Sequence, residues 1–170
     1  MSNKSPRRRS REFALQALYG WQINQQSWSD IDKQFAVAEG FDKADAALFK
    51  SITKGVIAEI DALTVAITPH LDRSWAEVSP VEKAVMLIGA YELSHTPETP
   101  YRVIINEAIE LAKSFGGTDG HKYVNGVLDK YAVAVRAEEV GDPPLMKARV
   151  TRKSAAPVVV TTKVTKKIVS

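Results

Sequence analysis

Arginines close to the amino terminus are the side chains in this sequence whose chemistry is easiest to assign. Residues 1–11 contain five bases and no acid, and four of these bases are Arg7, Arg8, Arg9 and Arg11. A guanidinium group bonds phosphate through two N–H donors and also stacks on nucleobases. We therefore predict that these four arginines bind RNA; a merely solvated run of charge is the alternative.

A second candidate surface lies later in the chain, where Lys122 and Tyr123 are adjacent. At the start of the last expected helix they would offer a positive charge and an aromatic face to an unpaired base. Tyr101, at the start of the preceding helix, would add a second aromatic face if the two helix starts converge. Tyrosines on helices more often form part of a core, so the residues alone leave both interpretations open.

The spacing of a catalytic or metal site is missing from the sequence. His70, His95 and His121 are 25 and 26 residues apart, which fits no paired-ligand motif, and the chain has no cysteine. The glycines at residues 116–120 lack the preceding strand and the fixed lysine of a phosphate-binding loop. We predict a protein that is not an enzyme and uses neither a metal nor a cofactor.

The net charge of +3 hides a strong asymmetry along the chain. Residues 1–11 and residues 136–170 each carry +5, whereas residues 12–135 carry −7. Basic ends favour contact with a polyanion, and an acidic body favours a basic protein partner. Composition alone also fits the alternative that the basic ends only increase solubility.

Apolar residues recur at helical spacing through the body of the chain, with no convincing strand pattern and no internal repeat. Ser5 followed by Pro6 is typical of a helix start. Ser79, Pro80 and Glu82 form a second such start, in which the Glu82 carboxylate would reach back to the Ser79 N–H. These patterns predict an all-α fold.

The helical pattern divides into segments separated by loops. We expect a short helix over about residues 29–40 and one long helix from residue 42 to just before Pro69. Loops near Trp75 and near Thr96 predict a seam between an amino-terminal and a carboxyl-terminal half. The prediction is a compact helical bundle of two halves over residues 1–135, with residues 1–11 as its basic head.

The last two expected helices cover residues 100–115 and 118–135 around a glycine turn. Asn106 and Asn125 lie on them, and we interpret both as structural hydrogen-bonding residues. Gly126 lies inside the second helix at a cost of roughly 1 kcal/mol relative to alanine. This cost predicts that a neighbouring helix passes close to Gly126.

The character of the chain changes in residues 136–170. Pro143 and Pro144 end any helix, and the residues that follow are mainly Lys, Thr, Val, Ala and Ser. This composition predicts a disordered basic tail. The chain shows neither the apolar start of a signal peptide nor a run of about 18 apolar residues, so we expect a cytoplasmic protein without a membrane segment.

Three separated segments of the sequence carry a family resemblance. In order, they are REFALQALYGWQ after the arginines, SPVEKAVMLIGAYEL, and INEAIELAKSFGG followed by HKYVNGVLDK. Over residues 6–132 the chain resembles the NusB family of transcription antitermination factors. The resemblance implies an all-helical RNA-binding protein whose partners are the ribosomal protein NusE, the boxA element of ribosomal RNA transcripts and the RNA polymerase antitermination complex.

The resemblance also implies roles for particular residues. It places RNA contacts at the amino-terminal arginines and around the start of the last helix, a region that includes Asp119, where an acid would cap or tune rather than attract RNA. It places NusE contacts on surfaces that include Tyr19, Glu77 and Glu82. We therefore predict an antitermination factor that holds boxA-like single-stranded RNA jointly with NusE. The alternatives are a helical module related to RNA-modifying enzymes and a non-specific basic nucleic-acid-binding protein.

Overall fold

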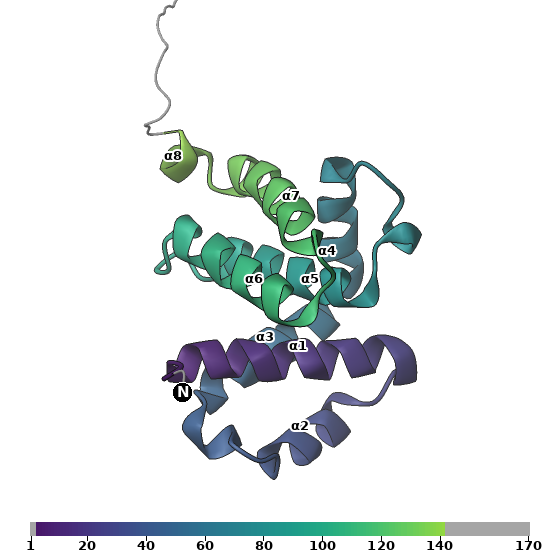
Figure 1. The fold of residues 1–170 in the computed structure, drawn as a ribbon, viewed down its shortest axis with the longest axis vertical. Helices are drawn as coiled ribbons and strands as arrows, with labels where there is room; N and C mark the ends of the chain where they lie inside the picture. Colours follow the sequence, from purple (N-terminus) through teal and green to yellow (C-terminus); the bar gives the residue numbers. More distant parts are fainter. Residues whose placement is uncertain (1–2, 142–170) are drawn as a thin grey trace, which may run out of the picture. The chain divides into compact units, whose positions relative to one another are not determined.

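The computed structural model describes residues 3–141, and the regular structure within them is entirely helical (Figure 1). The chain divides into two units, Met1–Val135 and Arg136–Ser170. The predicted all-α class is confirmed. In its described part the first unit contains α1 (Pro6–Asn24), α2 (Trp28–Ala36), α3 (Ala46–Ala58), α4 (Ile60–Ile67), α5 (Pro80–His95), α6 (Tyr101–Phe115) and α7 (Gly120–Val135), with 3-10 turns at η1 (Phe41–Lys43), η2 (Thr68–His70) and η3 (Trp75–Glu77).

The second unit begins with the short helix α8 (Ala137–Val140). Arg136 precedes this helix and donates a hydrogen bond to Glu139 at 3.0 Å. The predicted basic tail therefore starts with one helical turn. Residues 142–170 of that tail lie outside the described residues.

Helix α5 lies at the centre of the first unit. Residues 84–90 are all buried, which is the pattern of a helix enclosed on every side. Helices α1 and α3 pack against α5 in one half, and α4, α6 and α7 pack against it in the other (Figure 1). Two halves are therefore present, but their boundary differs from the predicted seam at Trp75. Helix α4 precedes that loop and packs with α5 and α7, so the first half ends at the break between α3 and α4.

Local hydrogen bonds set the starts of α1 and α5 as the sequence predicts. The Ser5 hydroxyl accepts a hydrogen bond from the Arg8 N–H at 3.1 Å, and the Ser79 hydroxyl accepts one from the Glu82 N–H at 3.2 Å. The Glu82 carboxylate does not complete the expected return bond to Ser79 among the described hydrogen bonds. It lies instead against Gly120, where an added Cβ would be 2.6 Å from Glu82 Oε2.

The single long helix expected from residue 42 is divided in the structure. Asp45 caps α3 by accepting from the Leu48 N–H at 3.0 Å, and the helix ends at Glu59, whose φ of −111° departs from helical values. Next to this break, the ring of Tyr91 from α5 lies against Gly55, where any side chain would overlap it. Because α3 and α4 are separate, both can pack on α5.

A four-residue connection at 116–119 joins α6 to α7, and the two helices pack against each other (Figure 1). The interpretation of Gly126 is wrong, because it is exposed and an added Cβ would meet no atom within 4 Å. The close approach to α7 occurs at Gly89 of α5, where an added Cβ would lie 2.7 Å from Leu128 Cδ1. A glycine at that position lets the central helix and α7 pack closely.

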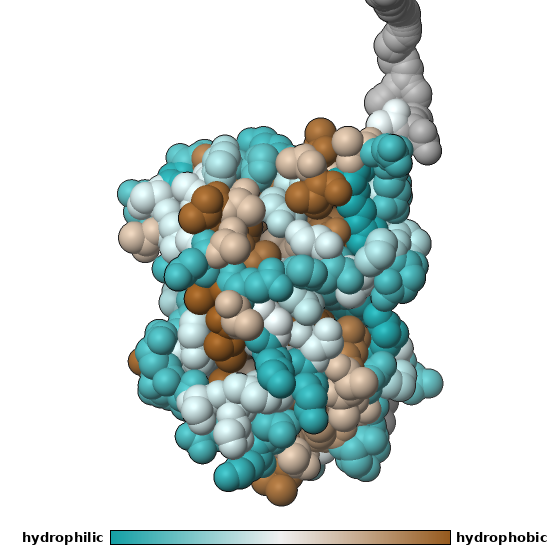
Figure 2. All heavy atoms as spheres, turned by 180° about the vertical axis from the view of Figure 1, so that it is seen from behind, coloured by the Kyte–Doolittle hydropathy of each residue, from teal (hydrophilic) through white to brown (hydrophobic). Residues whose placement is uncertain are grey.

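The surface of the protein carries its hydrophobic residues in scattered positions. On the face opposite to that of Figure 1, they form small groups among hydrophilic residues (Figure 2). Within residues 3–141, no helix combines the length and the apolar character that crossing a membrane requires.

Candidate nucleic-acid and protein interfaces

The predicted arginine head occupies the first two turns of α1, and its members differ in what they contact. Arg7 is exposed, with its guanidinium 3.7 Å from the Asp45 carboxylate. Arg9 is half-buried, and its guanidinium makes no ion pair with the described part of the chain. Arg7 and Arg9 therefore keep positive charge available to a polyanion.

Arg8 forms a two-pronged pair with Glu107 of α6. Its Nε donates to Oε1 at 3.1 Å and its Nη2 donates to Oε2 at 2.8 Å. The hydrogen bond from Arg8 lowers the pKa of the Glu107 carboxyl, although burial opposes this shift. Because a carboxylate already fills the guanidinium fork, Arg8 has fewer donors for a phosphate than Arg9.

Arg11 lies in the interior of the first unit, unlike the other three arginines. Its Nε donates to Glu92 Oε2 at 2.7 Å and its Nη2 to Oε1 at 2.8 Å, and the two side chains are only 4% and 1% exposed. Burial acts to lower the pKa of Arg11, but the hydrogen bonds and charge of Glu92 raise it. The predicted RNA contact does not fit this position, which instead links α1 to α5.

Two separate hollows lie along α1 and α6. The one beside the basic head is a polar hollow of about 160 Å³. The charged side chains that line this hollow are Lys4, Arg8, Glu12, Glu107 and Glu110. A second hollow of about 240 Å³ lies farther along the same two helices and is mainly apolar. It is lined by Leu15, Gln16, Tyr19, Val81 and Phe115.

The apolar hollow brings together residues that the sequence placed apart. Tyr19 of α1 and Phe115 of α6 line it, and each is 41% exposed. Val81 lines it beside Glu82, which is half-buried. Exposed aromatic rings around an apolar hollow are typical of a protein-binding surface. Phe115 was missed because the sequence pattern marked it only as the end of a helix.

Glu77, the third residue predicted to bind the protein partner, lies in η3 and not in this hollow. Its carboxylate accepts a hydrogen bond from the Ser74 hydroxyl at 3.1 Å and remains exposed. The structure therefore brings Tyr19 and the start of α5 together at the hollow and leaves Glu77 outside its lining.

The start of α7 carries a stacked pair that the sequence did not predict. The guanidinium carbon of Arg73 lies 4.1 Å from the centre of the Tyr123 ring, a cation–π contact. Tyr123 is half-buried as a residue but its hydroxyl is buried, and this burial raises the pKa of the hydroxyl. Lys122 and Asp119 are both exposed, with 3.4 Å between Nζ and Oδ1. Arg73 thus covers one face of Tyr123 and brings its own charge to the predicted surface.

Tyr101 does not join this surface. It lines a hollow with Asp129, two turns beyond Tyr123 along α7. The starts of α6 and α7 lie at opposite ends of the helix pair, because the chain reverses in the short 116–119 connection. The condition under which Tyr101 and Tyr123 would form one stacking surface is therefore not met.

The fold and these surfaces define an all-helical protein with a cationic edge and a neighbouring apolar hollow. The NusB family model matches residues 8–133. The chain therefore belongs to the NusB family of transcription antitermination proteins.

Individual relatives agree with this assignment. Over 137 residues the chain is 56% identical to the transcription antitermination protein NusB of Ralstonia pickettii (strain 12J), covering 81% of this chain and 88% of that protein. Over 136 residues it is 58% identical to the protein of the same name from Burkholderia mallei (strain SAVP1), covering 80% and 94%. Among solved structures, T. maritima NusB superposes with a TM-score of 0.71 at 28% identity, covering 82% of this chain and 99% of that one.

Proposed function

We propose that this protein binds boxA-like single-stranded RNA jointly with the ribosomal protein NusE, and that it thereby supports processive transcription of ribosomal operons by RNA polymerase. One observation carries the proposal: α1 contributes to both kinds of surface. Arg7 and Arg9 offer positive charge at its start, and Tyr19 lines an apolar hollow in its second half. One helix can therefore hold RNA and protein at the same time. We also propose that it acts in the cytoplasm, as a binding factor and not as an enzyme.

The RNA side of the proposal rests on charge and stacking. Arg7 and Arg9 neutralise phosphates, and Arg8 contributes the part of its guanidinium that Glu107 leaves open. Lys122, Asp119 and the Arg73–Tyr123 stack form a second contact, in which the partly exposed ring and the guanidinium offer stacking surfaces to a base. Tyr101 is a separate candidate contact, and Arg11 is left out because it is buried.

The protein side of the proposal rests on the apolar hollow. Tyr19 and Phe115 are rigid rings that can anchor a partner side chain, and Val81 lines the same hollow. Glu82 in the first turn of α5 and Glu77 just before this helix add negative charge, which suits a basic partner such as a ribosomal protein. The excess of acids in residues 12–135 points in the same direction.

Two arms of one titration experiment test this division. In the RNA arm, Arg9→Ala should weaken boxA-like and scrambled RNA alike and reduce the log–log salt slope by roughly 0.7. Lys54→Ala is the matched control, because it removes one exposed charge from α3. In the protein arm, Tyr19→Ala should weaken NusE about tenfold or more. Val65→Ala on α4 removes an exposed apolar side chain outside the hollow and should leave NusE binding unchanged.

The result that would overturn the proposal is equal affinity for boxA-like and scrambled RNA in the presence of NusE. That outcome would make the protein a non-specific basic nucleic-acid binder. If Tyr19→Ala remains folded by circular dichroism and binds NusE normally, the hollow is not the NusE surface.

A further inference from the structure

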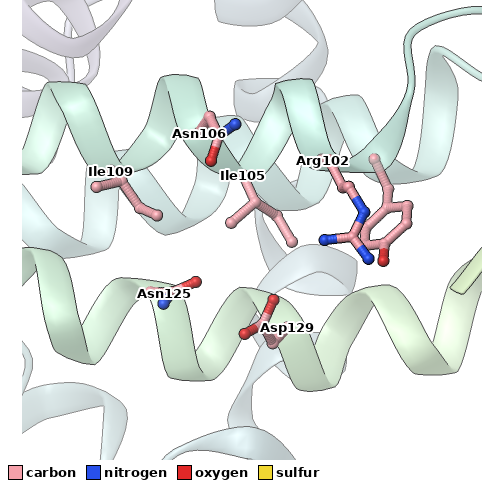
Figure 3. A pocket seen from close by; sticks show the side chains of 7 residues that line it. Arg102, Ile105, Asn106, Ile109, Asn125 and Asp129 are labelled. Carbon is pink, nitrogen blue, oxygen red and sulfur yellow. The ribbon is translucent and has the colours of Figure 1, made fainter. Parts of the chain in front are cut away.

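A polar groove lies between α6 and α7, apart from the surfaces assigned above to the arginines and to NusE. Its cavity volume is about 320 Å³. Arg102 and Asn106 border it from α6, and Asn125 and Asp129 border it from α7 (Figure 3). The side chain of Ile105 forms part of its apolar floor. Its volume is at the lower end of the range typical of small-molecule sites.

The four polar side chains form two facing pairs. Arg102 and Asn106 are one helical turn apart, as are Asn125 and Asp129, and the helices run in opposite directions. Arg102 and Asp129 therefore lie toward one end of the groove, and the two asparagines lie toward the other (Figure 3). The groove has a formal net charge of zero, with a donor group on one wall and an acceptor group on the other.

The facing walls of the groove make no hydrogen bond or ion pair with each other among the described residues, and Arg102 contacts only the ring of Tyr101 beside it. Arg102 and Asp129 are not within ion-pair distance of each other, and neither asparagine side chain makes a hydrogen bond within residues 3–141. The interpretation of Asn106 and Asn125 as structural hydrogen-bonding residues is therefore wrong for the described chain. Burial raises the pKa of the Asp129 carboxyl, although the Arg102 charge opposes the shift.

We propose that the α6–α7 groove, lined by Arg102, Asn106, Asn125 and Asp129, binds a guanine base. Guanine presents two acceptors, O6 and N7, on one edge and two donors, N1–H and the N2 amino group, on another. Arg102 can donate to the first edge and Asp129 can accept from the second. The carboxamides of Asn106 and Asn125 contain both a donor and an acceptor, so they can complete either edge.

Other bases satisfy the groove less well. Adenine has an amino group in place of O6 and lacks the donor pair, so the two charged walls lose their partners. Cytosine and uracil are too small to present two such edges to opposite walls. Tyr101 completes one end, with the guanidinium carbon of Arg102 at 5.2 Å from its ring centre, and offers a stacking surface for the base or its sugar.

A guanine base could reach the groove as part of a free nucleotide or as part of an RNA strand. Only binding of an RNA guanine rests on the proposed function. Because the groove is neutral overall, the phosphate adds little attraction, and binding should depend weakly on salt. This distinguishes the groove from the arginine head, where salt dependence is expected to be strong.

Titration of the full-length chain with GMP and AMP, followed by amide NMR, tests the proposal. GMP should shift the side-chain amide signals of Asn106 and Asn125 and should bind about tenfold more tightly than AMP. Asp129→Asn should abolish this preference, and Arg102→Gln provides a second test of the opposite wall. Asp42→Asn in η1 is the matched control and should keep the preference. A second titration uses two otherwise identical single-stranded RNAs with guanine or inosine at one position; inosine should bind more weakly.

Equal shifts with GMP and AMP, or none at the two asparagines, would overturn the proposal. So would retention of the guanine preference in folded Asp129→Asn. The nucleotide titrations use neither boxA RNA nor NusE, so their failure does not affect the proposed function, which the arginine and NusE titrations test. If the protein binds guanine but fails those titrations, the proposed function is refuted and the guanine site is supported.

Discussion

Replacing Arg11 by methionine removes one half of the buried ion pair and keeps a side chain of similar length. The Glu92 carboxylate then remains in the interior without a guanidinium that now donates two hydrogen bonds, at 2.7 and 2.8 Å. Removing one partner of a buried pair typically costs 3–5 kcal/mol, because the remaining charge stays desolvated. Both side chains are nearly inaccessible, at 4% and 1% exposure, so we expect a loss of about 3–5 kcal/mol.

A loss of this size is a large part of the 5–15 kcal/mol by which domains are typically stable. Urea denaturation followed by circular dichroism should therefore show a much lower midpoint for Arg11→Met. Arg9→Met is the matched control, since Arg9 lies two residues earlier and makes no described ion pair; its effect should be within about 0.5 kcal/mol. The double variant Arg11→Met/Glu92→Met removes both charges and should recover most of the loss.

The RNA titration then separates the structural role from a binding role. Under conditions in which Arg11→Met is folded, its log–log salt slope should equal that of the unmodified protein. If Arg11→Met costs less than about 1 kcal/mol and also lowers the salt slope, Arg11 is a phosphate ligand, and the reasoning from its burial is refuted.

Two further predictions concern stability. Gly126→Ala should stabilise the protein by up to about 1 kcal/mol in urea denaturation, because its new Cβ meets open space. Gly89→Ala should destabilise the protein, because its new Cβ would overlap Leu128. A destabilised Gly126→Ala variant would contradict the exposed position of Gly126. Because the Arg8 hydrogen bond lowers the pKa of Glu107, this pair stabilises the fold fully above the ordinary glutamate value of about 4.3 and progressively less as pH falls through the folded pKa. Stability measured from neutral to acid pH should therefore fall less steeply in Glu107→Gln, and an unchanged profile would show that this pair does not contribute.

Helix starts and the all-α class could be predicted from the sequence because they depend on neighbouring residues. The Ser5 and Ser79 caps bond N–H groups three residues ahead, so their geometry is set within one helical turn. Apolar spacing likewise identified the helices that enclose α5. The division at Glu59 could not be found this way, because the residues that contact this region come from a different helix: Tyr91 lies against Gly55, and His95 lies 2.8 Å from the Glu59 carboxylate.

The availability of a charge was decided by the tertiary structure. Arg9 and Arg11 belong to one basic run and look equivalent in the sequence, but the helix turns them in different directions. Arg11 meets Glu92, which is 81 residues away, and Arg8 meets Glu107, which is 99 residues away. No local pattern specifies such partners.

The candidate sites show the same division. Residue types identified Arg7 and Arg9 as candidates for binding chemistry, because guanidinium groups have the same chemistry in any fold, and the family resemblance implied Tyr19. Only the packed structure shows that Phe115 lines the hollow, that Arg73 stacks on Tyr123, and that α6 and α7 form a polar groove between them. A sequence carries the chemistry of each side chain, but helix packing determines which side chains face each other and which ones face the solvent.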